Sequence, residues 1–544
     1  MAWASTPKVV LGCFAFGVFW IMAVVPVVPF LPIGRTAGSL LGACLMVVFQ
    51  VLSPAEAFAA VDLPILGLLF GTMVVSVYLE RADAFKYLGH ALSWRSLGGK
   101  DLLCRLCLLS ALCSALFTND TTCVVLTQFV LEVCREKKLP PQPFLIALAS
   151  SANIGSAATP IGNPQNLVIA VESKIAFGKF LGGVVPAMVL GLIANTLLLL
   201  AYYWKKLRGV DEDAESSDIS IKLEQQRPEM ELLNSGLSFT QEQRIQQQDH
   251  RQEPKQQDSS YQTPDLEGQA ADTPDLGKSV AASTSTPDGQ LTQEAGAPPL
   301  PRSISSSRHL QRPSLIAINE ILRLEPRGSG HFQASLTRFQ RLRKKVWKVS
   351  VYLVTIGMLV AFLYGLDLSW TAITAAIVLM VLDFTDASPS LDQVSYSLLV
   401  FFSGMFIAVR GFNRTGAPGQ LWDAVEPHAR INTAAGIAIL SAVVILLSNV
   451  ASNVPTVLLL GARVAASAAA TEGASVKKAW LILAWVSTVA GNLTLVGSAA
   501  NIIVSEQASR MEEHPYNLSF WNHLRFGAPA TFIVIAVGLP LIQG

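Results

Sequence analysis

Apolar stretches of about the length needed to cross a bilayer, roughly 20 residues, recur along most of the chain. They fall at 9–30, 35–53, 61–80, 101–118, 122–134, 144–171 and 178–203, and then at 347–364, 368–383, 395–412, 431–449, 453–470, 479–505 and 524–542. The first stretch is followed by many more, so we interpret it as a membrane helix and not as a signal peptide. The pattern predicts an all-α polytopic membrane protein.

Residues 205–346 have a different composition. The stretch 241–258 is nearly all Gln, Glu, Arg, Asp and Lys, and Ser, Thr, Pro and Gly dominate 259–307. Such a segment buries too little apolar surface to offset the entropy of ordering. Lys and Arg cluster at both of its membrane boundaries, which favours the cytoplasmic side. The sequence therefore predicts an N-terminal membrane repeat (1–204), a long disordered cytoplasmic loop (205–346) and a C-terminal membrane repeat (347–544).

The composition narrows the class of protein further. Hydrophobic residues make up 51% of the chain and charged residues only 15%, against about 25% charged in globular proteins. This excludes an ordinary soluble enzyme, and the net charge of +1 argues against a nucleic-acid binder. The seven cysteines lie mostly inside apolar stretches, where they are typical of small buried hydrophobic residues. We expect no enzyme activity, no cofactor and no metal site.

A polar pattern occurs twice in these apolar halves. The first copy is FTNDTT at 117–122 followed by SSANIGSAATPIGNPQN at 150–166; the second is SNVASNVPT at 448–456 followed by STVAGNLTLVGSAAN at 487–501. Asn119 and Asn166 are 47 residues apart, and Asn453 and Asn501 are 48 apart. The two copies are offset by about 335 residues, so the chain contains an internal repeat.

Paired polar interruptions in two apolar halves indicate the binding site of a secondary transporter. In hydrocarbon a broken helix persists only where it lines a cavity or is buried in protein. We expect a re-entrant helical hairpin in each half, with tips at 118–122 and 452–456. We also expect a discontinuous helix in each half, unwound at 152–166 and 491–501. Five full crossings per half would make the second repeat inverted relative to the first.

These interruptions supply the candidate binding residues, which carry hydroxyls, amides or bare backbone. They are Thr118, Asn119, Thr121, Asn153, Gly155, Thr159, Gly162, Asn163, Asn166, Ser452, Asn453, Thr456, Asn492, Thr494, Gly497, Ser498 and Asn501. Because the tips and unwound segments contain no Lys or Arg, the simplest substrate is small, uncharged and rich in hydroxyl groups. The alternative is that these residues only pack helices together; four motifs at matched spacing favour a site.

Asp120 is the one ionisable residue at a predicted tip, and its counterpart in the second half is Val454. A charged carboxylate costs roughly 2.5–3.5 kcal/mol to insert at mid-membrane, so it is a functional candidate by default. We predict that Asp120 carries the coupled proton; the alternatives are that it caps the second leg of the hairpin or helps to hold a cation. Glu506 is a weaker candidate for a cavity wall. Asp383 and Asp386 are expected to end one span and begin a loop.

At these motifs the chain resembles a known family. The resemblance lies in FTNDT (117–121), ASSANIG (149–155), PIGNPQN (160–166), SNVPT (452–456) and GSAAN (497–501), and in FLPIGRTAG (30–38), DLPILGLLF (62–70) and SYSLLVFFSG (395–404). The first five segments are similar to the arsenite-permease-like branch of the ion transporter superfamily. The last three are similar to its plant silicon efflux transporters. The likeness covers both membrane halves and fails in the polar loop.

This resemblance implies a function and a fold. It implies export of silicic acid, and passage of arsenite, driven by inward proton movement across a plant plasma membrane. It also implies an inverted-repeat fold with a scaffold domain and a transport domain that bears the two hairpins. A sodium-coupled carrier of small anions and a channel for small neutral solutes remain alternatives, and the sequence leaves the oligomeric state open.

Overall fold

The computed structural model describes residues 5–24, 34–84, 98–207, 338–384, 386–511 and 515–544. All of them belong to one compact unit made of residues 1–223 and 338–544. Every regular element in these ranges is a helix, so the predicted all-α class is confirmed. The predicted loop 205–346 lies almost entirely outside the described residues.

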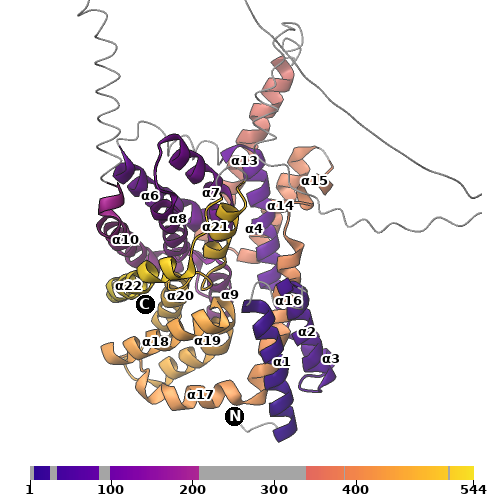
Figure 1. The fold of residues 1–544 in the computed structure, drawn as a ribbon. Coiled ribbons are helices and arrows are strands. Elements are labelled where there is room, and N and C mark those ends of the chain that lie inside the picture. Colours follow the sequence, from indigo (N-terminus) through magenta and orange to yellow (C-terminus); the bar gives the residue numbers. More distant parts are fainter. Residues whose placement is uncertain (1–4, 25–33, 85–97, 208–337, 385, 512–514) are drawn as a thin grey trace, which may run out of the picture. The chain divides into compact units, whose positions relative to one another are not determined.

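One group of helices, the scaffold helices, combines the first three long helices of each repeat. They are α1 (Thr6–Val24), α2 (Gly34–Val48) and α4 (Leu63–Arg81) from the first repeat, and α13 (Arg338–Leu363), α14 (Leu368–Asp383) and α16 (Tyr396–Thr415) from the second, with the short α3 (Pro54–Ala59) and α15 (Ser388–Leu391). Helix α4 packs against α13 and α14, and α16 packs against α1 and α2 (Figure 1). The third helix of each repeat therefore packs on the first two helices of the other.

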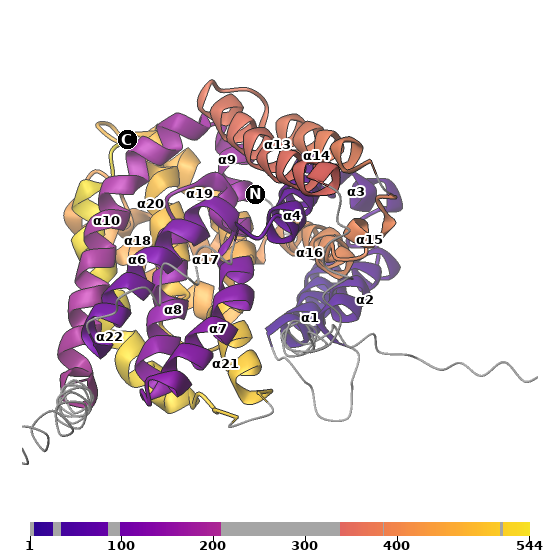
Figure 2. The same cartoon turned by 90° about the horizontal axis from the view of Figure 1, so that it is seen from above.

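A second group, the transport helices, contains the hairpins and broken helices. They are α6 (Gly99–Phe117), α7 (Asn119–Glu136), α8 (Pro141–Ser156), α9 (Pro164–Ser173) and α10 (Phe177–Tyr202), and α18 (Ala434–Ala451), α19 (Asn453–Ala470), α20 (Val476–Ala490), α21 (Ala499–Ser509) and α22 (Phe520–Gly538). Helix α7 packs against α8 and against α21 of the other repeat, while α19 packs against α20 and α9 (Figure 2). Partners are exchanged between the repeats here as well.

Short elements connect these helices. They are the 3-10 turns η1 (Pro160–Gly162), η3 (Glu426–His428) and η4 (Leu539–Leu541), and the helix α17 (Ala417–Val425) that follows α16. The scaffold helices contact the transport helices where α4 meets α9 and where α16 meets α19.

The predicted hairpins and broken helices are confirmed. Hairpin α6–α7 turns at Thr118 and hairpin α18–α19 turns at Ser452; the breaks cover 157–163 between α8 and α9, and 491–498 between α20 and α21. Eight of the described helices are long and apolar enough to cross a membrane. The count of five crossings per half stays a prediction.

Helix α13 extends beyond the predicted apolar span 347–364. It begins at Arg338, and the predicted start of the membrane repeat at residue 347 stays a prediction. Gln, Leu, Arg and Lys are good helix formers, so the helix continues from the apolar span into the basic residues that precede it. The start of an apolar stretch therefore marks where a helix enters hydrocarbon and not where the helix begins.

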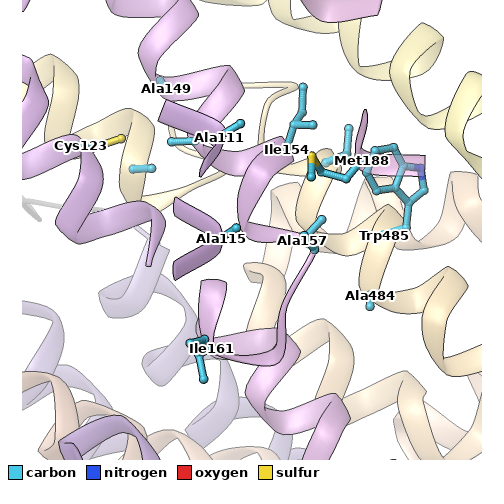
Figure 3. Packing of buried hydrophobic residues seen from close by; sticks show 14 of the residues in the cluster. Ala111, Ala115, Cys123, Ala149, Ile154, Ala157, Ile161, Met188, Ala484 and Trp485 are labelled. Carbon is cyan, nitrogen blue, oxygen red and sulfur yellow. The ribbon is translucent and has the colours of Figure 1, made fainter. Parts of the chain in front are cut away.

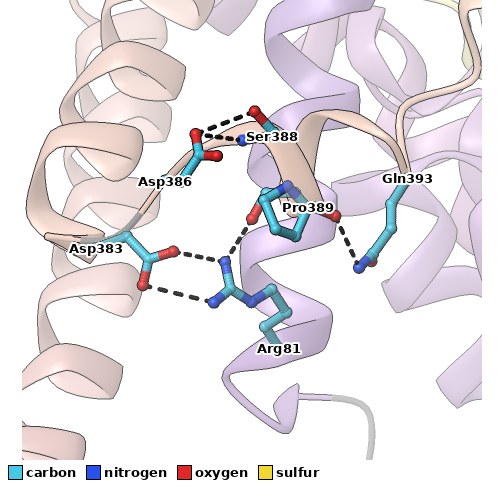
Figure 4. Close-up of polar contacts among 7 residues, drawn as sticks. Arg81, Asp383, Asp386, Ser388, Pro389 and Gln393 are labelled. Atoms are coloured by element: carbon cyan, nitrogen blue, oxygen red, sulfur yellow. Dashed lines mark hydrogen bonds and ion pairs between the residues drawn. The ribbon is translucent and has the colours of Figure 1, made fainter.

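A charged cluster, the Arg81 cluster, joins α4 to α14 and α15 (Figure 4). The Arg81 guanidinium binds the Asp383 carboxylate (Nη1 to Oδ2, 2.6 Å) and the Ser390 hydroxyl (2.5 Å). It also lies over the rings of Tyr78 and Trp347, 5.2 and 5.4 Å from their centroids. Asp383 ends α14 and precedes the segment before α15, as predicted, and its side chain is buried against Arg81.

Small side chains let the transport helices approach closely. Ala111 and Ala115 of α6, Ile154 and Ala157 at the end of α8, and Trp485 of α20 belong to one buried cluster (Figure 3). A Cβ atom on Gly155 would lie 2.2 Å from the Ala111 carbonyl oxygen. Gly155 is thus required for the contact between α6 and α8, which explains its presence without any contact to a substrate.

Candidate functional site

Each hairpin turns at a single residue in a strained conformation. Thr118 has φ 112° and Ser452 has φ 73°, a region that costs a residue other than glycine about 1–3 kcal/mol. The Thr118 hydroxyl accepts a hydrogen bond from the Thr121 N–H (3.2 Å) and so caps α7. At the second tip the Thr456 hydroxyl donates to the Ser452 carbonyl (2.8 Å). Both tips are therefore positioned by their own hydroxyl groups.

Each broken helix is closed by the side-chain amide of one asparagine, here named the closing amide. Asn166 Nδ2 donates to the carbonyls of Ser156 (3.2 Å) and Thr159 (3.3 Å), which precede it by 10 and 7 residues. Asn501 Nδ2 donates to the carbonyls of Gly491 (2.8 Å) and Thr494 (2.9 Å), again 10 and 7 residues earlier. The closing amides donate to carbonyls of the break, where the regular helical hydrogen bonds are interrupted. The repeat in the sequence therefore corresponds to the same pattern of hydrogen bonds in both broken helices.

The Asn153 network joins the first tip to both breaks. Asn153 Oδ1 accepts hydrogen bonds from Asn119 Nδ2 and Ser498 Oγ, both at 2.9 Å. Asn153 Nδ2 donates to Asn492 Oδ1 (2.7 Å) and Asn501 Oδ1 (3.1 Å). All five residues are buried, and all are uncharged. The structure therefore brings these five predicted residues together from segments more than 300 residues apart.

The second hairpin is attached to the second break. Asn449 of α18 donates from Nδ2 to the Ala490 carbonyl (2.9 Å) and accepts from the Thr494 hydroxyl (2.9 Å). Asn453 is buried beside the start of the break, where its Nδ2 would lie 3.2 Å from a Cβ on Gly491. Its Oδ1 has no hydrogen-bond partner among the described residues, so one buried acceptor at this tip is available.

Four further predicted residues shape the breaks. The Thr159 hydroxyl donates to the Ala115 carbonyl (2.6 Å), and Asn163 caps α9 by accepting from the Asn166 N–H (2.9 Å). A Cβ on Gly162 would lie 2.3 Å from the Ser156 carbonyl oxygen, and one on Gly497 would lie 2.5 Å from Asn449 Oδ1. Both glycines are therefore needed for close approach within the unwound segments.

Asp120 lies one residue beyond the start of α7. Because the Thr118 side chain caps this helix, the alternative that Asp120 is the N-cap is wrong. The Asp120 Oδ1 atom is buried and has no hydrogen-bond partner among the described residues. The Arg35 guanidinium, on α2 of the scaffold helices, is the charged group that interacts electrostatically with it. Glu506 instead pairs with Arg510 at the exposed end of α21.

A cavity of about 970 Å³ lies between scaffold and transport helices. It starts next to the site, at Val168 of α9 and Val457 of α19. It extends to the C-terminal half of α16 and the segment before α4. Its charged and polar lining residues are Asp62, Glu172, Arg410, Asn413, Arg414 and Arg463. The cavity therefore borders helices α9 and α19, which follow a break and a hairpin tip.

Several polar residues of this region were missed in the candidate set. Thr488 of α20 accepts from Asn163 Nδ2 (3.2 Å) and so links the two broken helices. Asn195 of α10 donates to Ser150 Oγ (3.0 Å). Asn449 and Thr488 lie inside the repeated motifs and could have been chosen from them. Asn195 and Arg35 lie outside those motifs, and only the packing reveals their role.

Comparison with known proteins supports a transport class. A family described as "Citrate transporter" matches residues 18–490. Silicon efflux transporter LSI3 of Oryza sativa subsp. japonica is 51% identical over 542 residues, covering 100% of this chain and 99% of that protein. Putative transporter arsB of Dictyostelium discoideum is 30% identical over 528 residues, covering 94% of this chain and 88% of that protein. The P protein of Mus musculus is 25% identical over 526 residues, covering 93% of this chain and 57% of that protein.

The helices and these relatives define a multi-pass membrane transporter of small solutes, and not an enzyme. The broken helices and the buried polar network are what such a transporter requires at its centre. The chain belongs to the citrate transporter family, and its similarity to the rice silicon efflux transporter runs from end to end.

Proposed function

We propose that the protein exports silicic acid from a plant cell across the plasma membrane, in exchange for inward-moving protons, by alternating access. The observation that carries this proposal is the 51% identity over the full chain to a silicon efflux transporter. The positive charges that flank the segment 205–346 support a cytoplasmic location for it. Five crossings in each half would make the second repeat inverted relative to the first.

The chemistry of the Asn153 network supports a neutral hydroxide as substrate. Its five side chains offer amide donors, amide acceptors and one hydroxyl, and none carries a charge. Silicic acid and arsenite are small neutral hydroxides at neutral pH, so they can exchange hydrogen bonds with these groups without a counter-charge. A citrate trianion would instead favour cations around the site. The remaining candidate residues of the tips and breaks would hold the neighbouring segments in place.

Asp120 and Arg35 support the coupling step. The ionised Asp120 carboxylate at the tip of a transport hairpin is attracted to Arg35 on the scaffold helices. Protonation removes that attraction, so proton uptake would free the hairpin to move relative to α2. The cavity that begins at Val168 and Val457 would then serve as the route on one side of the membrane.

The driving force is sufficient for export. One proton entering against one neutral solute moves one charge, and a potential of 100 mV contributes roughly 2.3 kcal/mol. A difference of one pH unit adds about 1.4 kcal/mol. Their sum corresponds to a silicic acid gradient of several hundredfold at a stoichiometry of about one to one.

Purified protein in liposomes tests the proposal. We expect saturable silicic acid flux that is driven by an imposed pH gradient and collapses with a proton uncoupler. Asp120→Asn should abolish the response to the pH gradient, whereas Glu506→Gln, at the exposed end of α21, should leave it unchanged. Flux that requires sodium would indicate a sodium-coupled carrier, and non-saturating flux that survives the uncoupler would indicate a channel.

A further inference from the structure

A buried histidine contacts the backbone of the second break. His523 of α22 is 2% exposed, and its Nε2 atom lies 3.1 Å from the carbonyl oxygen of Asn492. That carbonyl lies just past the end of α20, and the side chain of the same residue belongs to the Asn153 network. A carbonyl oxygen can only accept a hydrogen bond, so Nε2 must carry the proton and donate it.

Helix α22 is shaped to fit this unwound backbone. A Cβ atom on Gly527, one turn beyond His523, would lie 2.4 Å from the Asn492 carbonyl oxygen and 2.8 Å from that of Leu493. Only glycine allows the helix to approach this closely, and the approach is what brings the imidazole within reach of the carbonyl. His523 and Gly527 therefore support the same short stretch of chain.

Two buried polar atoms on α22 have no hydrogen-bond partner among the described residues. With Nε2 protonated, the neutral imidazole presents Nδ1 as an acceptor. His523 Nδ1 and Thr531 Oγ1 both lack a hydrogen-bond partner among the described residues, and Thr531 is 1% exposed. Buried polar atoms without partners are rare in native structures. Both side chains line a cavity of about 10 Å³, together with Ser150, Asn195 and Asn492.

The cavity matches the needs of one water molecule. Its volume accommodates a single water, and a buried water typically makes about three hydrogen bonds. A water there can donate to His523 Nδ1 and donate a second time to Ser150 Oγ. Ser150 is itself connected to the network, because its carbonyl accepts from Asn492 Nδ2 (3.2 Å).

We propose that His523 is a positioning residue for the second break. In its Nε2–H form it holds the Asn492 carbonyl, while a bound water joins its Nδ1 atom to Ser150. The imidazole and the water together fix the backbone from which the Asn492 side chain reaches Asn153. His523 touches no substrate in this arrangement and acts only through Asn492. Its effect on transport rests on the proposed function, whereas its tautomer and the bound water do not.

The structural part is tested by nuclear magnetic resonance of the full chain in lipid with ¹⁵N-labelled histidine. His523→Gln identifies the His523 signals by their loss, and His428→Gln, at an exposed position in η3, is the matched control. We expect a neutral Nε2–H imidazole at pH 7. We also expect Ser150→Ala, which removes the second partner of the water, to move the Nδ1 resonance toward that of a nitrogen without a hydrogen bond. An Nδ1–H tautomer, or an Nδ1 resonance unaffected by Ser150→Ala, overturns the proposal.

The transport part uses three variants in the liposome assay. His523→Leu removes the donor to Asn492, and we expect the KM for silicic acid to rise about tenfold, the effect of losing one hydrogen bond to a binding group. His523→Gln keeps an N–H donor, so we expect it to restore most of the affinity, and His428→Gln should behave like the parent. Equal KM values for His523→Leu and the parent contradict the positioning role. Absence of silicic acid flux in the parent would contradict the proposed function and leave the resonance test valid.

Discussion

The Arg81 cluster and the Asn153 network both join segments far apart in sequence, 302 residues for Arg81 and Asp383 and 339 for Asn153 and Asn492. The first uses full charges, with the guanidinium next to two aromatic rings, inside the scaffold helices. The second uses neutral amides and one hydroxyl inside the transport helices. Hydrogen bonds between neutral side chains in membrane proteins average about 0.6 kcal/mol, whereas breaking a buried ion pair costs several times more. We therefore expect a rigid connection at the Arg81 cluster and exchangeable contacts in the Asn153 network.

Removal of the Asp383 carboxylate should show the largest effect on stability. Asp383→Ala leaves the Arg81 guanidinium without its ionic partner, and we expect the free energy of unfolding to fall by about 3 kcal/mol, near the lower end for buried pairs because Arg81 is partly exposed. Thermal unfolding in detergent measures the change, with the exposed Asp386→Ala as control. Transport per folded molecule should persist; its loss at unchanged stability would place Asp383 in the transport cycle.

Asn153→Ala should affect transport more strongly than it affects stability. It removes four hydrogen bonds, and we expect a loss of about 2–3 kcal/mol in stability together with nearly complete loss of silicic acid flux. Asn432→Ala, on an exposed segment before α18, is the matched control. Flux comparable to the parent, measured on protein that remains folded, would remove the network from the binding site.

The closing amides should differ from each other. Asn166→Ala and Asn501→Ala each remove two or more hydrogen bonds to buried carbonyls, and we expect each to lower stability by about 1–2 kcal/mol. Asn501 also accepts from Asn153 (3.1 Å), whereas Asn166 does not, so Asn501→Ala should reduce flux more strongly. The ratio of the two flux values measures this difference; a larger loss for Asn166→Ala would show that the first break matters more.

The smallest effect belongs to an exposed carboxylate next to the Arg81 cluster. Hydrogen bonds from the backbone N–H and the hydroxyl of Ser388 lower the pKa of Asp386 below its usual value. A lowered pKa in the folded state stabilises the protein above the ordinary aspartate pKa of about 4, and the contribution disappears as pH falls through the lowered value. Asp386→Asn should therefore unfold at a slightly lower temperature than the parent at pH 7 and at the same temperature near pH 2.

Much of the transport region could be predicted because its signals repeat. The matched spacing from Asn119 to Asn166 and from Asn453 to Asn501 gave the hairpins, the breaks and most residues of the Asn153 network. The cap of α7 could not be predicted, since it depends on the positive φ of Thr118. The contacts of Arg35, Asp383 and His523 depend on which distant helices pack together, and single charged or aromatic residues in apolar stretches carry no signal for that.

The Asn153 network can form only after both repeats have been synthesised. Asn492, Ser498 and Asn501 follow Asn153 in the chain by 339, 345 and 348 residues. Asn153 is therefore synthesised long before these three partners. In hydrocarbon such a group finds no water to replace them. The first repeat therefore lacks these hydrogen-bond partners until the second repeat has been synthesised and docked.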